Sequence, residues 1–227
     1  MTELAFLGTG NFLAPLGRYW NSFVVDESVL VEPSPTALPH LRRCGIPLEA
    51  VEVVVVSHFH ADHCFGWPFL LQALSEGGGG RTLYVVGPPG IEAHLARMNE
   101  AGAVASVTEL GRANLDLRFV EVVHVPYLRC FGYLFDRGGR VIAYSGDTTP
   151  CDGLSELARE SEVLVVECNG RHTPPGVQGA HMDEESVRAL QAAHPDVHLI
   201  LTHLGEQVDT ASMTGTTIPD DFERLTV

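Results

Sequence analysis

The sequence is most informative where an apolar run, Val51-Glu52-Val53-Val54-Val55-Val56, leads into Ser57-His58-Phe59-His60-Ala61-Asp62-His63. The run predicts a buried strand, and the four side chains His58, His60, Asp62 and His63 are of types that bind transition metals. In an extended segment side chains two apart point the same way, so His58 and His60 can bind one ion while Asp62 and His63 face a second. This spacing predicts two metal ions side by side.

Length and composition indicate one globular unit. The chain has 227 residues, 45% of them hydrophobic, and a mean hydropathy of +0.10, with no segment that reads as a linker. We therefore expect a single domain over residues 1–227. The five cysteines are odd in number and form no C-x-x-C pair, which argues against a disulfide framework.

The charge of the chain limits its partners. Its formal net charge is −15, and all 14 basic residues are arginine. Such a protein repels a long polyanion except where metal ions or local arginines reverse the field, so no extended nucleic-acid surface is expected. The segment Met1–Leu7 lacks the features of a signal peptide, and no apolar run approaches a membrane span. We expect a cytoplasmic protein that does not bind membranes.

Short β-branched runs alternate with helical stretches, which predicts an α/β fold. Strands are expected at residues 4–7, 23–25, 29–31, 51–56, 83–86, 115–125, 131–135, 141–144, 163–166 and 197–201. Helices are expected at residues 38–44, 67–74, 91–99, 154–159 and 184–193. Residues 136–140 are expected to form a hairpin loop.

Three further candidate ligands each follow an expected strand. His124 comes after residues 119–123, Asp147 after 141–146 and His203 after 197–202. If these strands share a direction, their carboxyl ends line one edge, where α/β proteins assemble sites. Seven ligands then fit two ions. The expected grouping is His58, His60 and His124 on one ion, Asp62, His63 and His203 on the other, and Asp147 bridging.

These motifs resemble the metallo-β-lactamase-fold hydrolases, and within them the ribonuclease Z-like branch. The resemblance rests on five segments in the family's order: Phe6–Gly10 followed by Pro15, Arg18 and Asn21-Ser22; Ser57–His63; His124 upstream of Phe131-Gly132-Tyr133; Tyr144–Thr148; and Leu201–His203. It implies a four-layer αβ/βα sandwich with two divalent metal ions, usually zinc. Because His/Asp sites also accept manganese or iron, the sequence leaves the metal open.

The same resemblance marks Glu167 and His181 as an acid pair. Asp62 is a further candidate catalytic residue. The local sequences Glu167-Cys168-Asn169 and His181-Met182-Asp183 depart from the branch's usual pattern, and a structural pair is the alternative. His181-Met182-Asp183 and Leu201–Gly205 are more similar to the phosphonate-pathway cyclic phosphodiesterase. Arg18 and Asn21 are expected to bind a substrate phosphate or to hold the first loop.

The resemblance implies a phosphodiesterase that acts through a hydroxide bridging two metal ions. Ribonuclease Z enzymes carry a long tRNA-clamping arm between the third histidine and the bridging aspartate, whereas residues 125–146 here are fully used by two expected strands. The expected substrate is therefore a small phosphodiester or a short RNA end. A lactonase or thioesterase and an iron-binding redox module are the alternatives. The oligomeric state is left open, and a homodimer is compatible with the sequence.

Overall fold

The computed structural model describes residues 1–76, 83–98, 117–170 and 180–227. The chain divides into two compact units. The first contains Met1–Gly8, Tyr19–Ala113 and Asp220–Val227, and the second contains Thr9–Arg18 and Asn114–Pro219. The expectation of a single domain stays a prediction.

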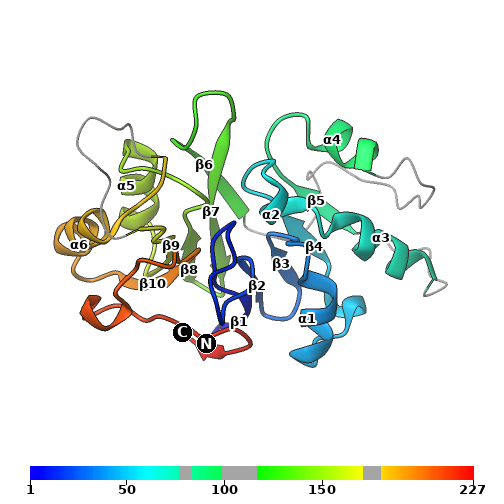
Figure 1. The fold of residues 1–227 in the computed structure, drawn as a ribbon, viewed down its shortest axis with the longest axis horizontal. Coiled ribbons are helices and arrows are strands. Elements are labelled where there is room, and N and C mark those ends of the chain that lie inside the picture. The colour runs from blue at the N-terminus through cyan, green and yellow to red at the C-terminus, as the bar shows by residue number, and fades with distance from the viewer. Residues whose placement is uncertain (77–82, 99–116, 171–179) are drawn as a thin grey trace. The chain divides into compact units, whose positions relative to one another are not determined.

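The first unit is built on a six-stranded sheet in the order β11-β1-β2-β3-β4-β5 (Figure 1). Its strands are β1 (Glu3–Gly8), β2 (Ser22–Val25), β3 (Val29–Val31), β4 (Val53–Val55), β5 (Tyr84–Val86) and β11 (Arg224–Thr226). Its helices are α1 (Ala37–Arg43), α2 (Ala61–Cys64), α3 (Trp67–Glu76) and α4 (Ile91–Met98). Strand β4 runs parallel to both of its neighbours, as expected for a strand buried in an α/β sheet.

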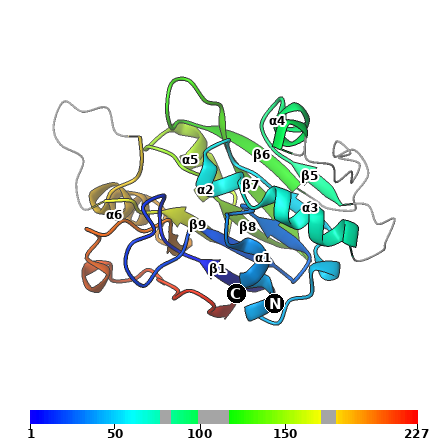
Figure 2. The same cartoon turned by 45° about the vertical axis from the view of Figure 1, so that its right-hand side comes forward.

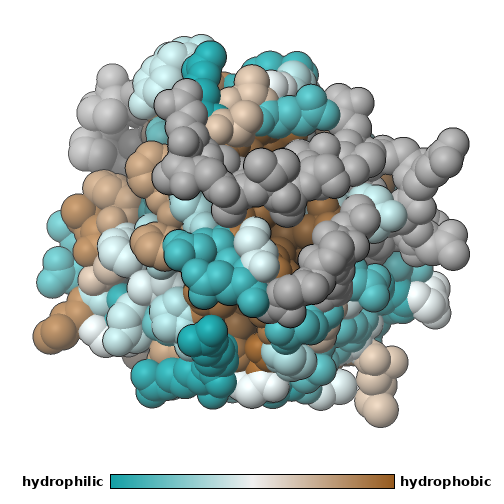
Figure 3. Space-filling model, turned by 90° about the vertical axis from the view of Figure 1, so that its right-hand side faces the viewer, coloured by the Kyte–Doolittle hydropathy of each residue, from teal (hydrophilic) through white to brown (hydrophobic). Residues whose placement is uncertain are grey.

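The core of this unit lies between the sheet and its helices. Helices α1 and α3 lie against one face of this sheet (Figure 2). Alternate residues of the strands, such as Leu7, Leu30 and Val54, pack with Leu41 of α1 and Trp67 of α3. This period of two is why one face of each strand meets the helices. On the side of α3 and α4, the described surface is largely hydrophilic, with hydrophobic side chains in a central strip (Figure 3).

The second unit is built on a five-stranded sheet in the order β10-β9-β8-β7-β6. Its strands are β6 (Leu117–Val122), β7 (Cys130–Arg137), β8 (Arg140–Tyr144), β9 (Val163–Glu167) and β10 (His198–Thr202). Helices α5 (Asp152–Arg159) and α6 (Glu184–Ala193) pack on this sheet through Leu154, Leu157, Val187 and Leu190.

Strand β6 is antiparallel to β7, which is antiparallel to β8, while β8, β9 and β10 are parallel. Strands β6, β8, β9 and β10 therefore run in the same direction and end at one edge. This confirms the expected shared direction of the strands that precede His124, Asp147 and His203, whose role as ligands stays a prediction.

Most expected elements are present, with bounds that differ by a few residues. The hairpin loop expected at 136–140 is wrong in length, because β7 and β8 pair up to Arg137 and Arg140 around the two-residue turn Gly138-Gly139. Both glycines have positive φ angles, 66° and 88°, the conformation that continues the twist of a tight hairpin. The expected end of a helix at residue 99 and the expected start of a strand at 115 lie outside the described residues.

Strand β11 is absent from the expected elements. It has three residues, two of them exposed, and carries no apolar run. It pairs with β1 through Glu3 and Thr226, which are far apart in the sequence. A pattern in consecutive residues therefore could not predict this strand. Among the helices that the structure describes, none combines the length and apolarity needed to cross a bilayer.

Candidate metal centre

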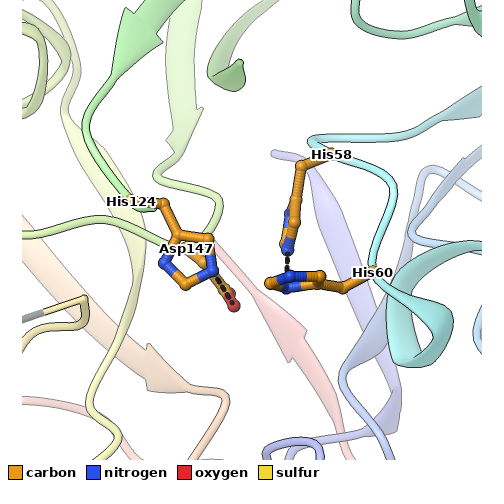
Figure 4. A group of neighbouring side chains, drawn as sticks. All are labelled: His58, His60, His124 and Asp147. Atoms are coloured by element: carbon orange, nitrogen blue, oxygen red, sulfur yellow. Dashed lines mark hydrogen bonds and ion pairs between the residues drawn. The ribbon is translucent and has the colours of Figure 1, made fainter. Parts of the chain in front are cut away.

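In the first unit, two imidazole rings converge just beyond β4. His58 Nε2 lies 2.9 Å from His60 Nδ1, and His58 Nδ1 lies 2.9 Å from the Ser57 hydroxyl (Figure 4). A hydroxyl that accepts the Nδ1 proton keeps the Nε2 lone pair available. The two side chains therefore point to the same place, as their spacing predicts, and their binding of one ion stays a prediction.

The other two residues of the motif belong to the short helix α2. His60 is the N-cap of α2, which places Asp62 and His63 in its first turn. His63 Nε2 lies 3.3 Å from Asp62 Oδ2, so these two side chains form a second pair. The change from extended chain to helix at His60 separates the two pairs along the backbone.

Glu32 supports this motif from the end of β3 and was missed in the sequence. Its side chain is fully buried, and its carboxylate accepts the Ser57 N–H at 3.2 and 3.3 Å and contacts His63 Nδ1 at 3.2 Å. A carboxylate on the far nitrogen of a metal-binding imidazole orients the ring and raises its basicity. The available signal was a charged residue directly after the buried strand Val29–Val31, the same pattern that marks the candidate ligands.

We expect Glu32→Gln to weaken metal binding by roughly 10- to 100-fold, because the imidazole of His63 loses its carboxylate partner. Titration of metal-free protein with Zn²⁺ against a competing chelator would measure this. Glu52→Gln is the matched control, since Glu52 is exposed at the opposite end of β4. An unchanged zinc affinity in Glu32→Gln would remove Glu32 from the site.

Cys64 is buried directly beside His63. Burial raises the pKa of its thiol to about 12, and the thiol donates to the His60 carbonyl at 3.1 Å. Its burial and this contact favour the packing role of a small apolar side chain.

In the second unit, four candidate residues gather at the edge where β6, β8, β9 and β10 end. Glu167 closes β9, His203 follows β10 directly, and Asp147 and His124 follow β8 and β6 by a few residues. Strand β7 stands between β6 and β8 in the sheet. The gap is bridged by the loop after Asp147, whose Thr149 N–H donates to the Val123 carbonyl at 2.7 Å.

The Asp147 carboxylate lies at the centre of this group. Its Oδ2 is 3.6 Å from His203 Nε2 and 3.7 Å from His181 Nδ1. The same oxygen is 3.9 Å from His124 Nε2 (Figure 4). His124 Nδ1 contacts the Ala180 carbonyl at 2.5 Å, which turns Nε2 towards Asp147. A carboxylate oxygen ringed by imidazole nitrogens suits the bridging position expected for Asp147.

Glu167 and His181 form a tight pair beside Asp147. The Glu167 carboxylate lies 2.9 and 3.1 Å from His181 Nδ1 and accepts the Thr148 N–H at 2.6 Å. One ligand atom from each of Asp147, Glu167, His181 and His203 falls within 4.8 Å of the others. The structure thus brings the expected acid pair into the same cluster as two of the expected metal ligands.

Two of the histidines around Asp147, His124 and His181, differ in their electrostatics. Burial lowers the pKa of His124 and outweighs the attraction of Asp147, which favours the neutral, ligating ring. Burial also opposes charge on His181, but the attraction and hydrogen bond of Glu167, with Asp147 beyond, raise its pKa above the ordinary value. His181 is therefore suited to hold a proton.

The donor set of this unit fits a divalent cation. Tetrahedral zinc with nitrogen and oxygen ligands at about 2.0–2.1 Å separates neighbouring ligand atoms by roughly 3.3 Å. The nitrogens 3.6–3.9 Å from Asp147 Oδ2 are slightly beyond hydrogen-bond range and near that spacing. Asp147 and Glu167 are both buried, and buried carboxylates require compensating positive charge.

Arg18 and Asn21, the residues expected to bind a substrate phosphate, are held within the second and the first unit, respectively. Arg18 Nη1 donates to the Thr9 hydroxyl and to the Pro219 carbonyl at 3.1 Å, and Asn21 is buried just before β2. These contacts favour a role in holding the first loop, and a substrate role for either residue stays a prediction.

Comparison with known proteins places the chain in a family. The family model of the β-lactamase superfamily domain matches residues 27–204, which is most of the chain. The chain belongs to the β-lactamase superfamily. Its predicted class, a metal-dependent hydrolase, is confirmed at this level.

Members of the superfamily resemble this chain over nearly all of its length. Ribonuclease Z of Haloferax volcanii is 25% identical over 252 residues, covering 83% of this chain and 76% of that protein. The metallo-β-lactamase fold protein YhfI from Bacillus subtilis superposes with a TM-score of 0.83 at 17% identity, covering 99% of this chain and 98% of that protein. A diphosphatase of the PhnP family superposes with a TM-score of 0.81 at 19% identity, covering 100% of this chain and 98% of that protein. The predicted α/β class and metallo-β-lactamase fold are confirmed.

Proposed function

We propose that this superfamily member is a phosphodiesterase that uses two divalent metal ions and acts on a small phosphodiester or a short RNA end. The proposed ligands come from the segment at residues 58–63 of the first unit and from the strand ends of the second unit. They are His58, His60, Asp62, His63, His124, Asp147 and His203. Zinc is the proposed metal, since the donors are imidazole nitrogens and carboxylate oxygens, with manganese or iron as alternatives. When bound, the ions would supply a nucleophilic hydroxide and offset the charge that develops at phosphorus.

The observation that carries the proposal is the pair of Glu167 and His181. A leaving alkoxide is a poor leaving group and needs a proton, which a positioned acid must supply. The Glu167 carboxylate holds His181 Nδ1 at 2.9 Å and raises the pKa of the ring, so His181 can donate its Nε2 proton to the leaving oxygen. A carbonyl substrate with an activated leaving group has less need of this pair.

The short segment between His124 and Asp147 in the second unit supports a small substrate. Strands β7 and β8 and their two-residue turn occupy most of the chain between His124 and Asp147, which leaves no room for an arm. The net charge of −15 also disfavours a long polyanion. The names of the relatives, ribonuclease Z and diphosphatase, both describe reactions at phosphorus and support the same class.

Hydrolysis of bis(p-nitrophenyl) phosphate by Zn- and Mn-loaded protein tests the proposal, with chelated protein as the blank and a homoserine lactone as the competing substrate. Metal-dependent diester turnover is the expected result. Lactone or thioester turnover without diester turnover would instead assign a carbonyl hydrolase. Bound iron with neither activity would assign a redox module.

A further inference from the structure

Asn169 lies two residues beyond Glu167, where three chain segments of the second unit meet. Its N–H donates to the carbonyl of Met182, the neighbour of His181, at 3.0 Å. Its own carbonyl lies so close to Gly205, two residues beyond His203, that a Cβ there would approach within 1.7 Å. The backbone of Asn169 is thus held between the segments that carry His181 and His203.

A directed chain of hydrogen bonds sets the orientation of the Asn169 amide. The Leu13 N–H can only donate, and it donates to Asn11 Oδ1 at 3.0 Å. The other end of the Asn11 side chain is therefore its NH₂ group, which donates to Asn169 Oδ1 at 2.6 Å. The oxygen of Asn169 is thereby turned towards Asn11, and its NH₂ group, with two N–H donors, is turned away.

The loop that carries Asn11 is itself fixed to this edge. The Asn11 N–H donates to the Leu204 carbonyl at 3.1 Å, and the Leu204 N–H donates to the Thr9 carbonyl at 2.8 Å. Leu204 directly follows His203, so these backbone hydrogen bonds tie the loop to the segment that carries the candidate ligand. A side chain locked by such bonds is the kind of group that can position a ligand precisely.

We propose that Asn169 is a substrate-binding residue whose NH₂ group donates to a non-bridging oxygen of the phosphodiester, and that Asn11 is the positioning residue that orients it. This inference rests on the proposed function. A neutral donor suits an anionic oxygen without adding charge beside the metal ligands, and hydrogen bonds to charged groups are the stronger ones.

Two near-isosteric substitutions test the inference on the full, metal-loaded chain. Asn169→Asp keeps an acceptor for Asn11 but replaces the donors by a carboxylate oxygen. In Asn11→Asp, one carboxylate oxygen still accepts from Leu13 and the other faces Asn169, which must rotate its amide and turn its oxygen outward. Gln191→Glu on α6 is the control for an amide-to-carboxylate change in the same unit.

We expect KM for bis(p-nitrophenyl) phosphate to rise by about 10- to 100-fold in both Asn variants, with a smaller change in kcat, and to stay unchanged in Gln191→Glu. Thermal unfolding and metal content should match the wild type, which a merely structural role of Asn11 would not predict together with a raised KM. Wild-type turnover with an unchanged KM in Asn169→Asp would overturn this inference alone.

If the wild type hydrolyses no diester, the proposed function fails first. Calorimetric titration with thymidine monophosphate then decides the inference separately. Weaker binding to Asn169→Asp than to the wild type supports it. Equal binding, or no binding to either protein, overturns it.

Discussion

Replacing Asp147 by asparagine is expected to lower kcat/KM for a phosphodiester by at least about 10³-fold and to reduce the metal content of the protein. The change removes the charge at the centre of three imidazole nitrogens, 3.6–3.9 Å away, and with it the ligand proposed to bridge both ions. Transition-state stabilisation of several kcal/mol is attributed to such ions, and about 1.4 kcal/mol corresponds to a factor of ten. Steady-state kinetics together with metal analysis of the purified protein would measure both effects.

Asp196→Asn is the matched control for this change. Asp196 is exposed in the turn before β10, and its replacement alters the net charge equally. Retention of both metal equivalents and of turnover in Asp147→Asn would contradict the proposed ligand set. Loss of turnover with full metal content would instead assign Asp147 to a step other than metal binding.

The second large effect is expected for His181→Ala, and it should depend on the leaving group. For a diester with an alkoxide leaving group we expect kcat to fall by roughly 10²- to 10⁴-fold, the range typical of a lost general acid. For bis(p-nitrophenyl) phosphate, whose leaving group needs little protonation, the loss should be small. Comparing the two substrates in one variant separates proton donation from damage to the site.

His198→Ala is the control, because His198 begins β10 at the edge opposite to His203. The pH profile gives a second reading. The Glu167 carboxylate raises the pKa of His181, so the protonated, active form persists to higher pH than in an ordinary histidine. Glu167→Gln should move the descending limb of kcat to lower pH. Equal losses of kcat for the two substrates in His181→Ala would assign the pair a structural role. An unchanged position of the descending limb of the kcat pH profile in Glu167→Gln would do the same.

The candidate ligands could be predicted because their signals are local. An apolar run followed by a cluster such as His58-Phe59-His60-Ala61-Asp62-His63 needs only strand periodicity and ligand chemistry to be recognised. His124, Asp147 and His203 each follow such a run, and the shared direction of β6, β8 and β10 confirms that reasoning for the second sheet.

Glu32 and Asn169 escaped prediction for a physical reason. The role proposed for each depends on a contact with a residue that is distant in sequence: Glu32 with His63, and Asn169 with Asn11. A single glutamate or asparagine after a strand is common in any protein, so neither position stands out until the backbone brings its partner within reach.

The strands and the candidate metal-binding residues follow from the sequence, because the burial period of a strand and the chemistry of metal ligands can be recognised in consecutive residues. The approach of His124 to Asp147 depends on the hydrogen bond from the Thr149 N–H to the Val123 carbonyl, which links segments that follow β8 and β6 on either side of β7. The raised pKa of His181 depends on a glutamate fourteen residues away, and the direction of the Asn169 amide on a backbone N–H at Leu13. These are distances and orientations between segments, and only folding sets them.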